Sequence, residues 1–194
     1  MEYAIRGGLS NDFLKNELEI NLEELIKKTL DSINVLSKYT HIQEEVFSVE
    51  ESKGDKIVMD SMRALTNFFE EIDCLKDNLI HKYEHLLFDI IDGIFANETF
   101  NEIDMLSTHH LVDEIVLDKV GILDINSNEI SIEIIGTVYV QHMYGSDRDR
   151  RKGDGDEFNS SYPFTVSKII DVLYPLGISI DSSEIMVDNS SFFE

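Results

Sequence analysis

The first part of the chain has the hydrophobic spacing of a helix. Between Leu22 and about Val46, apolar positions recur at steps of three and four residues, as one face of a helix requires. These positions are Leu22, Leu25, Thr29, Ile33, Leu36 and Tyr39 or Thr40. Asn21 can cap the start of this segment, and Glu23 and Glu24 suit the positive end of the helix dipole. We therefore expect a first helix over about 22–46.

A longer helical pattern follows a polar break at residues 48–56. It runs from about Asp55 to Phe95, and we expect Gly93 and the polar residues after it to end the helix. The main stripe is Ile57, Ser61, Leu65, Phe68, Ile72, Leu75, Leu79, Tyr83, Leu86 and Ile90, with a second apolar edge at Phe69, Ile80, Leu87 and Ile91. So wide a stripe favours a helical hairpin packed on a sheet over an extended coiled coil. Burial of this stripe predicts that Phe68→Ala costs about 3–5 kcal/mol.

After Asp113 the period changes to two, which is typical of half-buried strands. The strand-like segments cover 114–125, 128–144, 162–172 and 178–187, with a turn at 126–128 and a bulge expected at Gly136. Helices followed by strands predict an α+β fold with an antiparallel sheet. We expect a helical hairpin region over 1–105 and a small antiparallel β module over 106–194.

The composition restricts the function. The 194 residues carry a formal charge of −23, and a hydrophobic content of 42% argues against disorder. The single cysteine, Cys74, cannot form a disulfide within the chain and fits a reducing cytosol. No signal peptide or membrane-spanning run is evident, so we expect a cytoplasmic protein that does not bind membranes. The charge argues against direct nucleic-acid binding and favours a basic protein partner or a multivalent cation.

Residues 144–158, YGSDRDRRKGDGDEF, place four basic residues within five positions of this acidic chain. Oxygen-rich loops of this kind can bind a divalent cation, but Arg151 and Phe158 occupy two of the ligand positions of an EF-hand counted from Asp147. One interpretation is therefore a solvated hairpin connection that contacts a partner, with glycines at 145, 153 and 155 free to adopt positive φ. The other is a cation or catalytic carboxylate site. The residues assigned to the partner-binding loop are Asp147, Arg148, Asp149, Arg150, Arg151, Asp154 and Asp156.

A second candidate is HKYEH at 81–85, which matches the H-x-x-E-H pattern of inverted zinc peptidases. His81 and His85 lie one helical turn apart, and Glu84 could act as a base. No spacing marks a third ligand, so we expect a solvated stripe and no structural zinc; Glu157 is a further metal candidate. His109 and His110 are neighbours on a strand and do not converge on one ion. We expect Cys74 to be an inert core thiol, and we assign no catalytic residue and no required cofactor.

Several short elements in the C-terminal half have a familiar order. They are a Gly-Thr-Val strand at 136–138, a Tyr-Gly-Ser-Asp turn at 144–147, a Gly-Asp-Gly segment at 153–155 and an aromatic-Pro-Phe strand start at 162–164. Over residues 134–167 this order resembles the C-terminal part of bacterial predicted pPIWI-associating nucleases and related phage-defence components. The resemblance implies a defence context. In such proteins a nuclease-like domain normally precedes the module, whereas here a helical hairpin without an evident carboxylate cluster precedes it.

Three functional hypotheses follow. The first is a non-catalytic acidic binding or regulatory subunit of a bacterial anti-phage defence or toxin-antitoxin system, which docks on a basic protein such as a defence effector or nuclease. The second is a metal-dependent nuclease or other hydrolase that uses the carboxylates of residues 147–157. The third is an acidic mimic of DNA.

Overall fold

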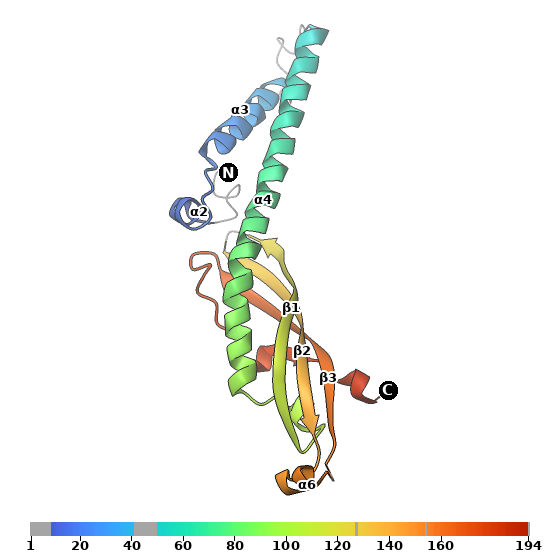
Figure 1. The fold of residues 1–194 in the computed structure, drawn as a ribbon. Coiled ribbons are helices and arrows are strands. Elements are labelled where there is room, and N and C mark those ends of the chain that lie inside the picture. Colours follow the sequence, from blue (N-terminus) through green and yellow to red (C-terminus); the bar gives the residue numbers. More distant parts are fainter. Residues whose placement is uncertain (1–8, 41–49, 127, 154, 194) are drawn as a thin grey trace. The chain divides into compact units, whose positions relative to one another are not determined.

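The computed structural model describes residues 9–40, 50–126, 128–153 and 155–193 (Figure 1). The chain forms two compact units, Met1–Leu79 and Ile80–Glu194. They divide within one long helix, α4 (Glu51–Asn97), so this helix contributes to both. The sequence predicts the boundary between the helical region and the β module at 105/106, where helical periodicity gives way to strand periodicity. The two compact units divide between Leu79 and Ile80, and the turns of α4 that follow pack on the sheet.

Unit 1 contains α2 (Asn11–Asn16), α3 (Glu23–Thr40) and the first half of α4. The Ser10 hydroxyl accepts a hydrogen bond from the Phe13 amide at 3.1 Å and so caps α2. Asn21 Oδ1 accepts from the Glu23 amide at 3.1 Å, which confirms the predicted cap of α3. The end of the predicted first helix, 41–46, lies outside the described residues.

The polar break predicted at 48–56 is partly wrong, because α4 begins at Glu51 and includes Gly54. Its predicted end near Phe95 agrees with the structure to within two residues, although Gly93 does not itself stop the helix. The helix continues through Gly93 to Asn97, whose side-chain amide donates to the Gly93 carbonyl at 2.7 Å. Both glycines therefore sit inside the helix, where the rest of the sequence overrides their weak helix propensity. No helix in the described ranges, α4 included, is long and apolar enough to cross a membrane.

Burial along the predicted stripe of α4 is uneven in unit 1. Leu75 and Leu79 are buried, whereas Phe68 and Ile72 are only half-buried and Leu65 is 41% exposed. The prediction of continuous burial is therefore wrong at Leu65. Since about 3–5 kcal/mol applies to a fully buried phenylalanine, we now expect Phe68→Ala to cost less than that.

Unit 2 is a four-stranded antiparallel sheet in the order β1-β2-β3-β4, with the second half of α4 on one face (Figure 1). This architecture confirms the predicted α+β class. The strands are β1 (His109–Ile125), β2 (Glu129–Met143), β3 (Glu157–Asp171) and β4 (Ile185–Val187), with short helices α5 (Asn101–Asp104), α6 (Asp147–Lys152), η2 (Ser182–Glu184) and η3 (Ser190–Phe193). The last predicted strand, 178–187, is thus reduced to three residues. Asp181 caps η2 within that segment.

Strict alternation produces the core of unit 2. The even-numbered side chains of β2 and β3 are turned inward, and one face of α4 meets them. The buried residues include Ile130, Ile132, Ile134, Val138 and Val140 of β2, Tyr162, Phe164 and Val166 of β3, and Tyr83, Leu87, Ile91 and Phe95 of α4. The Phe95 and Phe164 rings lie 5.2 Å apart between centroids. The buried helical positions are four residues apart, so Leu87 and Ile91 of the predicted second edge lie deeper than Leu86 and Ile90 of the main stripe.

Gly136 is needed for close packing, not for a bulge in its own strand. It pairs with Leu117, and the register shift next to it falls between Leu117 and Lys119, on β1. A Cβ atom at Gly136 would lie 2.3 Å from Phe164 Cζ and 2.6 Å from the Val116 carbonyl oxygen. The predicted bulge position is therefore corrected to the neighbouring strand. Three such shifts along β1 interrupt the regular ladder of this edge strand, which hinders pairing with another chain.

Candidate partner-binding site

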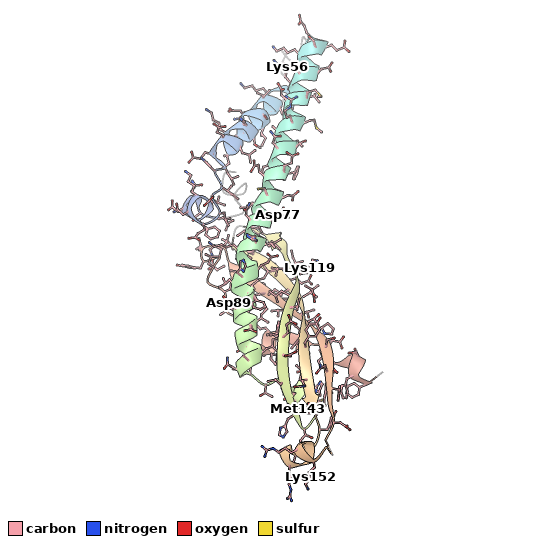
Figure 2. The ribbon with its side chains drawn as sticks, in the orientation of Figure 1. Lys56, Asp77, Asp89, Lys119, Met143 and Lys152 are labelled. Carbon is pink, nitrogen blue, oxygen red and sulfur yellow. The ribbon has the colours of Figure 1, made fainter. Side chains whose placement is uncertain are left out.

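The connection between β2 and β3 contains the segment that the sequence assigns to partner contact. The Tyr144 amide donates to the Asp156 carbonyl at 2.9 Å, which closes the base of the connection. Gly145 (φ 86°) and Gly153 (φ 80°) have positive φ, as predicted, and flank the short helix α6. In Figure 2, Met143 at the end of β2 and Lys152 on α6 show where the connection leaves the sheet. The sequence predicted the connection but not the helix inside it.

The helix gathers basic side chains on one face. Arg148, Arg151 and Lys152 are exposed, and their spacing of three and four residues places them side by side. Asp156 and Glu157, which follow α6, are exposed too. Asp147, Asp149 and Arg150 belong to α6 but their side chains lie outside the described part, as does all of Asp154. Ion pairs between these arginines and the neighbouring carboxylates therefore stay a prediction.

A buried histidine that the sequence reasoning did not single out supports the root of this connection. His142 of β2 is fully buried. Its Nδ1 lies 2.9 Å from Ser107 Oγ, and its Nε2 lies 2.8 Å from the Tyr162 hydroxyl. One signal could have found it. In the alternating strand 129–143, His142 has the inward parity of Val138 and Val140, so a polar side chain was bound to enter the core.

The hydrogen-bond network assigns a role to each nitrogen of His142. Ser107 Oγ donates to the His109 carbonyl at 2.8 Å, so this hydroxyl accepts from Nδ1–H, and Nε2 accepts from Tyr162. Burial lowers the pKa of His142, and the nearby His110 lowers it further. The ring is therefore neutral at pH 7. With both nitrogens engaged in this way, the ring links β2, β3 and the segment before β1 and does not activate Ser107 as a nucleophile.

Aromatic rings surround His142 and complete the root of the connection. Phe158 stacks on His142 at 5.1 Å and on Tyr144 at 5.7 Å between centroids. Phe192 of η3 lies 5.8 Å from His142, and the Tyr144 hydroxyl donates to the Leu106 carbonyl. Residues on both sides of α6 are thus held by stacking and hydrogen bonds. Such a root allows the exposed part of the connection to vary without unfolding the sheet.

The predicted H-x-x-E-H residues lie on the exposed side of α4. His81 Nδ1 is 3.6 Å from Glu84 Oε2, and the His81 and His85 rings meet edge to face at 6.0 Å. Glu84 and His85 also line a shallow hollow of about 320 Å³ whose other wall is residues 115–120 of β1. Over the part of the chain that the structure describes, no three His, Cys, Asp or Glu side chains are placed to share a metal ion. The expected lack of zinc stays a prediction, which elemental analysis of the purified chain would check.

The remaining singled-out residues are dispersed. His109 and His110 start β1, and His110 Nδ1 lies 3.6 Å from Asp104 Oδ1. Glu157 starts β3, away from the histidines of α4 in sequence and on a different element. Cys74, expected in the core, is exposed on α4, where its sulfur accepts from the Asn78 side chain at 3.4 Å. It lies just outside the buried positions Leu75 and Leu79, so the prediction of a core thiol is wrong.

Comparison with known proteins agrees with the resemblance seen in the sequence. Residues 73–193 match one family model described as predicted pPIWI-associating nuclease, and residues 1–65 match a second with the same description. The earlier resemblance over 134–167 lies inside the first match. No curated protein and no solved structure matches the chain. Because a family model matches more than half of its length, the chain belongs to the family of predicted pPIWI-associating nucleases.

Proposed function

We propose that this protein is a non-catalytic, acidic binding or regulatory subunit of a bacterial anti-phage defence or toxin-antitoxin system. It acts in the cytoplasm and docks on a basic protein. The description of its family contains the word associating, so the first partner to test is a pPIWI protein from the same source. Docking would restrain or position the partner.

The observation that carries this proposal is the charge. The chain has 39 acidic residues against 16 basic ones. Such an excess steers an oppositely charged protein toward the complex and repels acidic surfaces. Binding should therefore weaken as salt is added, since near physiological ionic strength salt largely screens exposed charges that lie more than about 8–10 Å apart.

The β2–β3 connection supplies the specific part of the contact. Its three exposed cations on one face of α6 can make bidentate or point contacts to carboxylates of the partner. The carboxylates that flank α6 can meet the partner's own cations. Because the root is fixed by the ring stack around His142, the two ends of the connection lose little conformational freedom on binding.

The test compares two triple variants of equal charge change. Asp147, Asp154 and Asp156 are changed to Asn together, and the control changes the exposed Asp113, Glu114 and Asp124 of β1 to their amides. Affinity for the pPIWI partner is measured by calorimetry at two salt concentrations. We expect the first variant to bind at least tenfold more weakly, a change of about 1.4 kcal/mol, and the control to bind nearly as the wild type. Equal losses in both would show that only overall charge matters, against a role for the connection.

The second candidate function, a metal-dependent nuclease, is favoured by the family description. Its site would be the carboxylates of residues 147–157. Cation-dependent cleavage of DNA or RNA by the purified single chain, lost in the 147/154/156 variant with the fold intact, would establish it and refute the non-catalytic role. Inhibition of many unrelated DNA-binding proteins by the chain would instead favour the DNA mimic.

A further inference from the structure

The first half of α4 exposes a continuous apolar face. Five large hydrophobic side chains there are between 41% and 61% exposed: Val58, Met59, Met62, Leu65 and Phe69. Single exposed apolar residues are ordinary on protein surfaces, but five within twelve positions of one helix are not. In Figure 2, Lys56 and Asp77 mark the two ends of this part of α4. We call these five residues the apolar face of α4.

These side chains lie together because of their spacing. Val58, Met62, Leu65 and Phe69 follow one another at steps of four, three and four residues, which is one side of a helix. At 100° per residue, the five cover an arc of about 120°. The apolar face is thus as wide as the stripe with which a helix normally meets a protein core.

This face is different from the sides of α4 that serve unit 1. Ser61, Leu75 and Leu79 are the buried positions in this half of the helix. Residues of α3 and a third side of α4 line a shared hollow of about 260 Å³. That side of α4 contributes Asp60, Arg63, Ala64 and Asn67. The apolar face is therefore an additional side of α4, which the described part of unit 1 does not cover.

Five exposed carboxylates border the two ends of the apolar face, and we call them the acidic rim. Glu51 and Asp55 precede it on the same side of the helix, and Glu70, Asp73 and Asp77 follow along its edge, all exposed. Basic residues are fewer there, and Lys56 and Arg63 flank Met59 on one side, both exposed. Arg63 lies on the flank with its guanidinium 3.7 Å from Asp60, and Lys76 is half-buried. The combination is an apolar strip with an acidic rim.

We propose that the apolar face of α4 binds a basic amphipathic helix of the partner protein. An apolar stripe bordered by lysines or arginines would bury the five side chains and pair its cations with the rim, as in helix-in-groove recognition. Met59 and Met62 adapt to a range of shapes, which suits such a contact. A second copy of this chain is the less suitable occupant, because it would bring the same carboxylates against the rim. This inference rests on the proposed function and names the surface and the partner chemistry.

The test uses a defined probe in place of the partner. A Leu-Lys peptide with a helical apolar stripe carries a fluorophore, and a Leu-Glu peptide with the same stripe is the charge control. Binding is followed by fluorescence anisotropy with the wild type, with Met62→Glu/Phe69→Glu, and with Leu123→Glu/Ile169→Glu. The last pair has the same charge change and replaces residues that are 62% exposed in β1 and β3.

We expect the Leu-Lys peptide to bind the wild type and the Leu123/Ile169 variant alike, and the Met62/Phe69 variant at least tenfold more weakly. The Leu-Glu peptide should not bind. Equal binding of the Leu-Lys peptide to all three proteins would show electrostatic attraction alone and overturn the proposal. A wild-type dimer in light scattering that becomes a monomer in the Met62/Phe69 variant would assign the face to a second copy and overturn it as well. A third outcome would also overturn the proposal: the Leu-Lys peptide does not bind the wild type, and Met59 and Met62 resist oxidation. The apolar face would then be covered by its own chain.

The same variants separate this inference from the proposed function. If the pPIWI partner binds the Met62/Phe69 variant as tightly as the wild type, the proposed function stands and the apolar face is not the docking site. If the partner binds neither, the proposed function itself fails.

Discussion

The two halves of α4 are one helix in two environments. In unit 2 its residues Tyr83, Leu87, Ile91 and Phe95 are at most 4% exposed against the sheet, whereas in unit 1 Val58, Met62 and Phe69 are more than half exposed. Both sets are apolar and both have helical spacing. The difference lies in what stands opposite. A sheet face with alternating Ile, Val and Phe covers the first set, and a rim of carboxylates borders the second.

This contrast shows that the same periodicity can serve stability or binding. A buried stripe contributes about 25 cal/mol for each Å² that it removes from water. An exposed stripe contributes that free energy only when a partner arrives. Substitutions in the two halves should therefore differ in stability while they look alike in sequence.

The largest expected difference is between Leu87→Ala and Met62→Ala. Leu87 is fully buried, so its truncation removes apolar contacts and leaves a cavity, at a cost of about 2–5 kcal/mol. Met62 is 58% exposed, and its truncation should change stability by less than about 0.5 kcal/mol. Urea denaturation followed by circular dichroism measures both. Similar losses in the two variants would mean that the first half of α4 is buried in solution.

A second pair of substitutions compares a glycine in the sheet of unit 2 with a glycine in the first half of α4. At Gly136 a methyl group would overlap Phe164 and the Val116 carbonyl, so Gly136→Ala should cost about 1–3 kcal/mol, the usual range for overpacking. Gly54, inside the first half of α4, has nothing within 4 Å of an added Cβ. Gly54→Ala should therefore stabilise the chain by about 0.5–1 kcal/mol through helix propensity. Thermal melts of both variants suffice, and a stabilising Gly136→Ala would refute the close packing of β1, β2 and β3.

A third prediction concerns the stability of unit 2 at acidic pH. Burial lowers the pKa of His142 below its usual value near 6.5, so the unfolded chain takes up this proton at a higher pH than the folded chain does. Stability should then fall as the pH drops below about 6.5, until the folded pKa is passed. The measurement is the urea midpoint at pH 7.5 and 5.5 in the wild type and in His142→Gln. The wild type should lose more on acidification than the variant, and an equal loss would exclude His142 as a cause.

Local patterns predicted much of this fold. Alternation in 128–144 and 162–172 predicted strands because a sheet with one covered face imposes a period of two, although β3 begins earlier, at Glu157. Asn21 was found by its capping chemistry alone. The basic cluster between two strands was placed on an exposed connection between β2 and β3. The ends of the helices and strands were predicted less accurately. The helix passes through Gly54 and Gly93 because the gain from neighbouring turns exceeds the cost of a single glycine.

The candidate site was predicted only in its exposed part. Arg148, Arg151 and Lys152 are visible as a charge cluster in the sequence, but Ser107, His142 and Tyr162 are far apart along the chain and meet only when β1, β2 and β3 pair. The register that joins them pairs His110 with His142 and places Phe158 opposite His142. Register is a property of the whole sheet, so no short segment contains it.

The sequence by itself determined the α+β class, the family resemblance, the acidic charge and the exposed connection, because composition and period are local properties of a chain. The tertiary structure alone decided which of two similar apolar stripes on α4 is core and which is surface. It also decided that Phe164 leaves room only for a glycine at position 136, and that burial lowers the pKa of His142 where two hydroxyls meet its ring nitrogens. Burial depends on what lies across from a side chain, and that neighbour comes from elsewhere in the sequence.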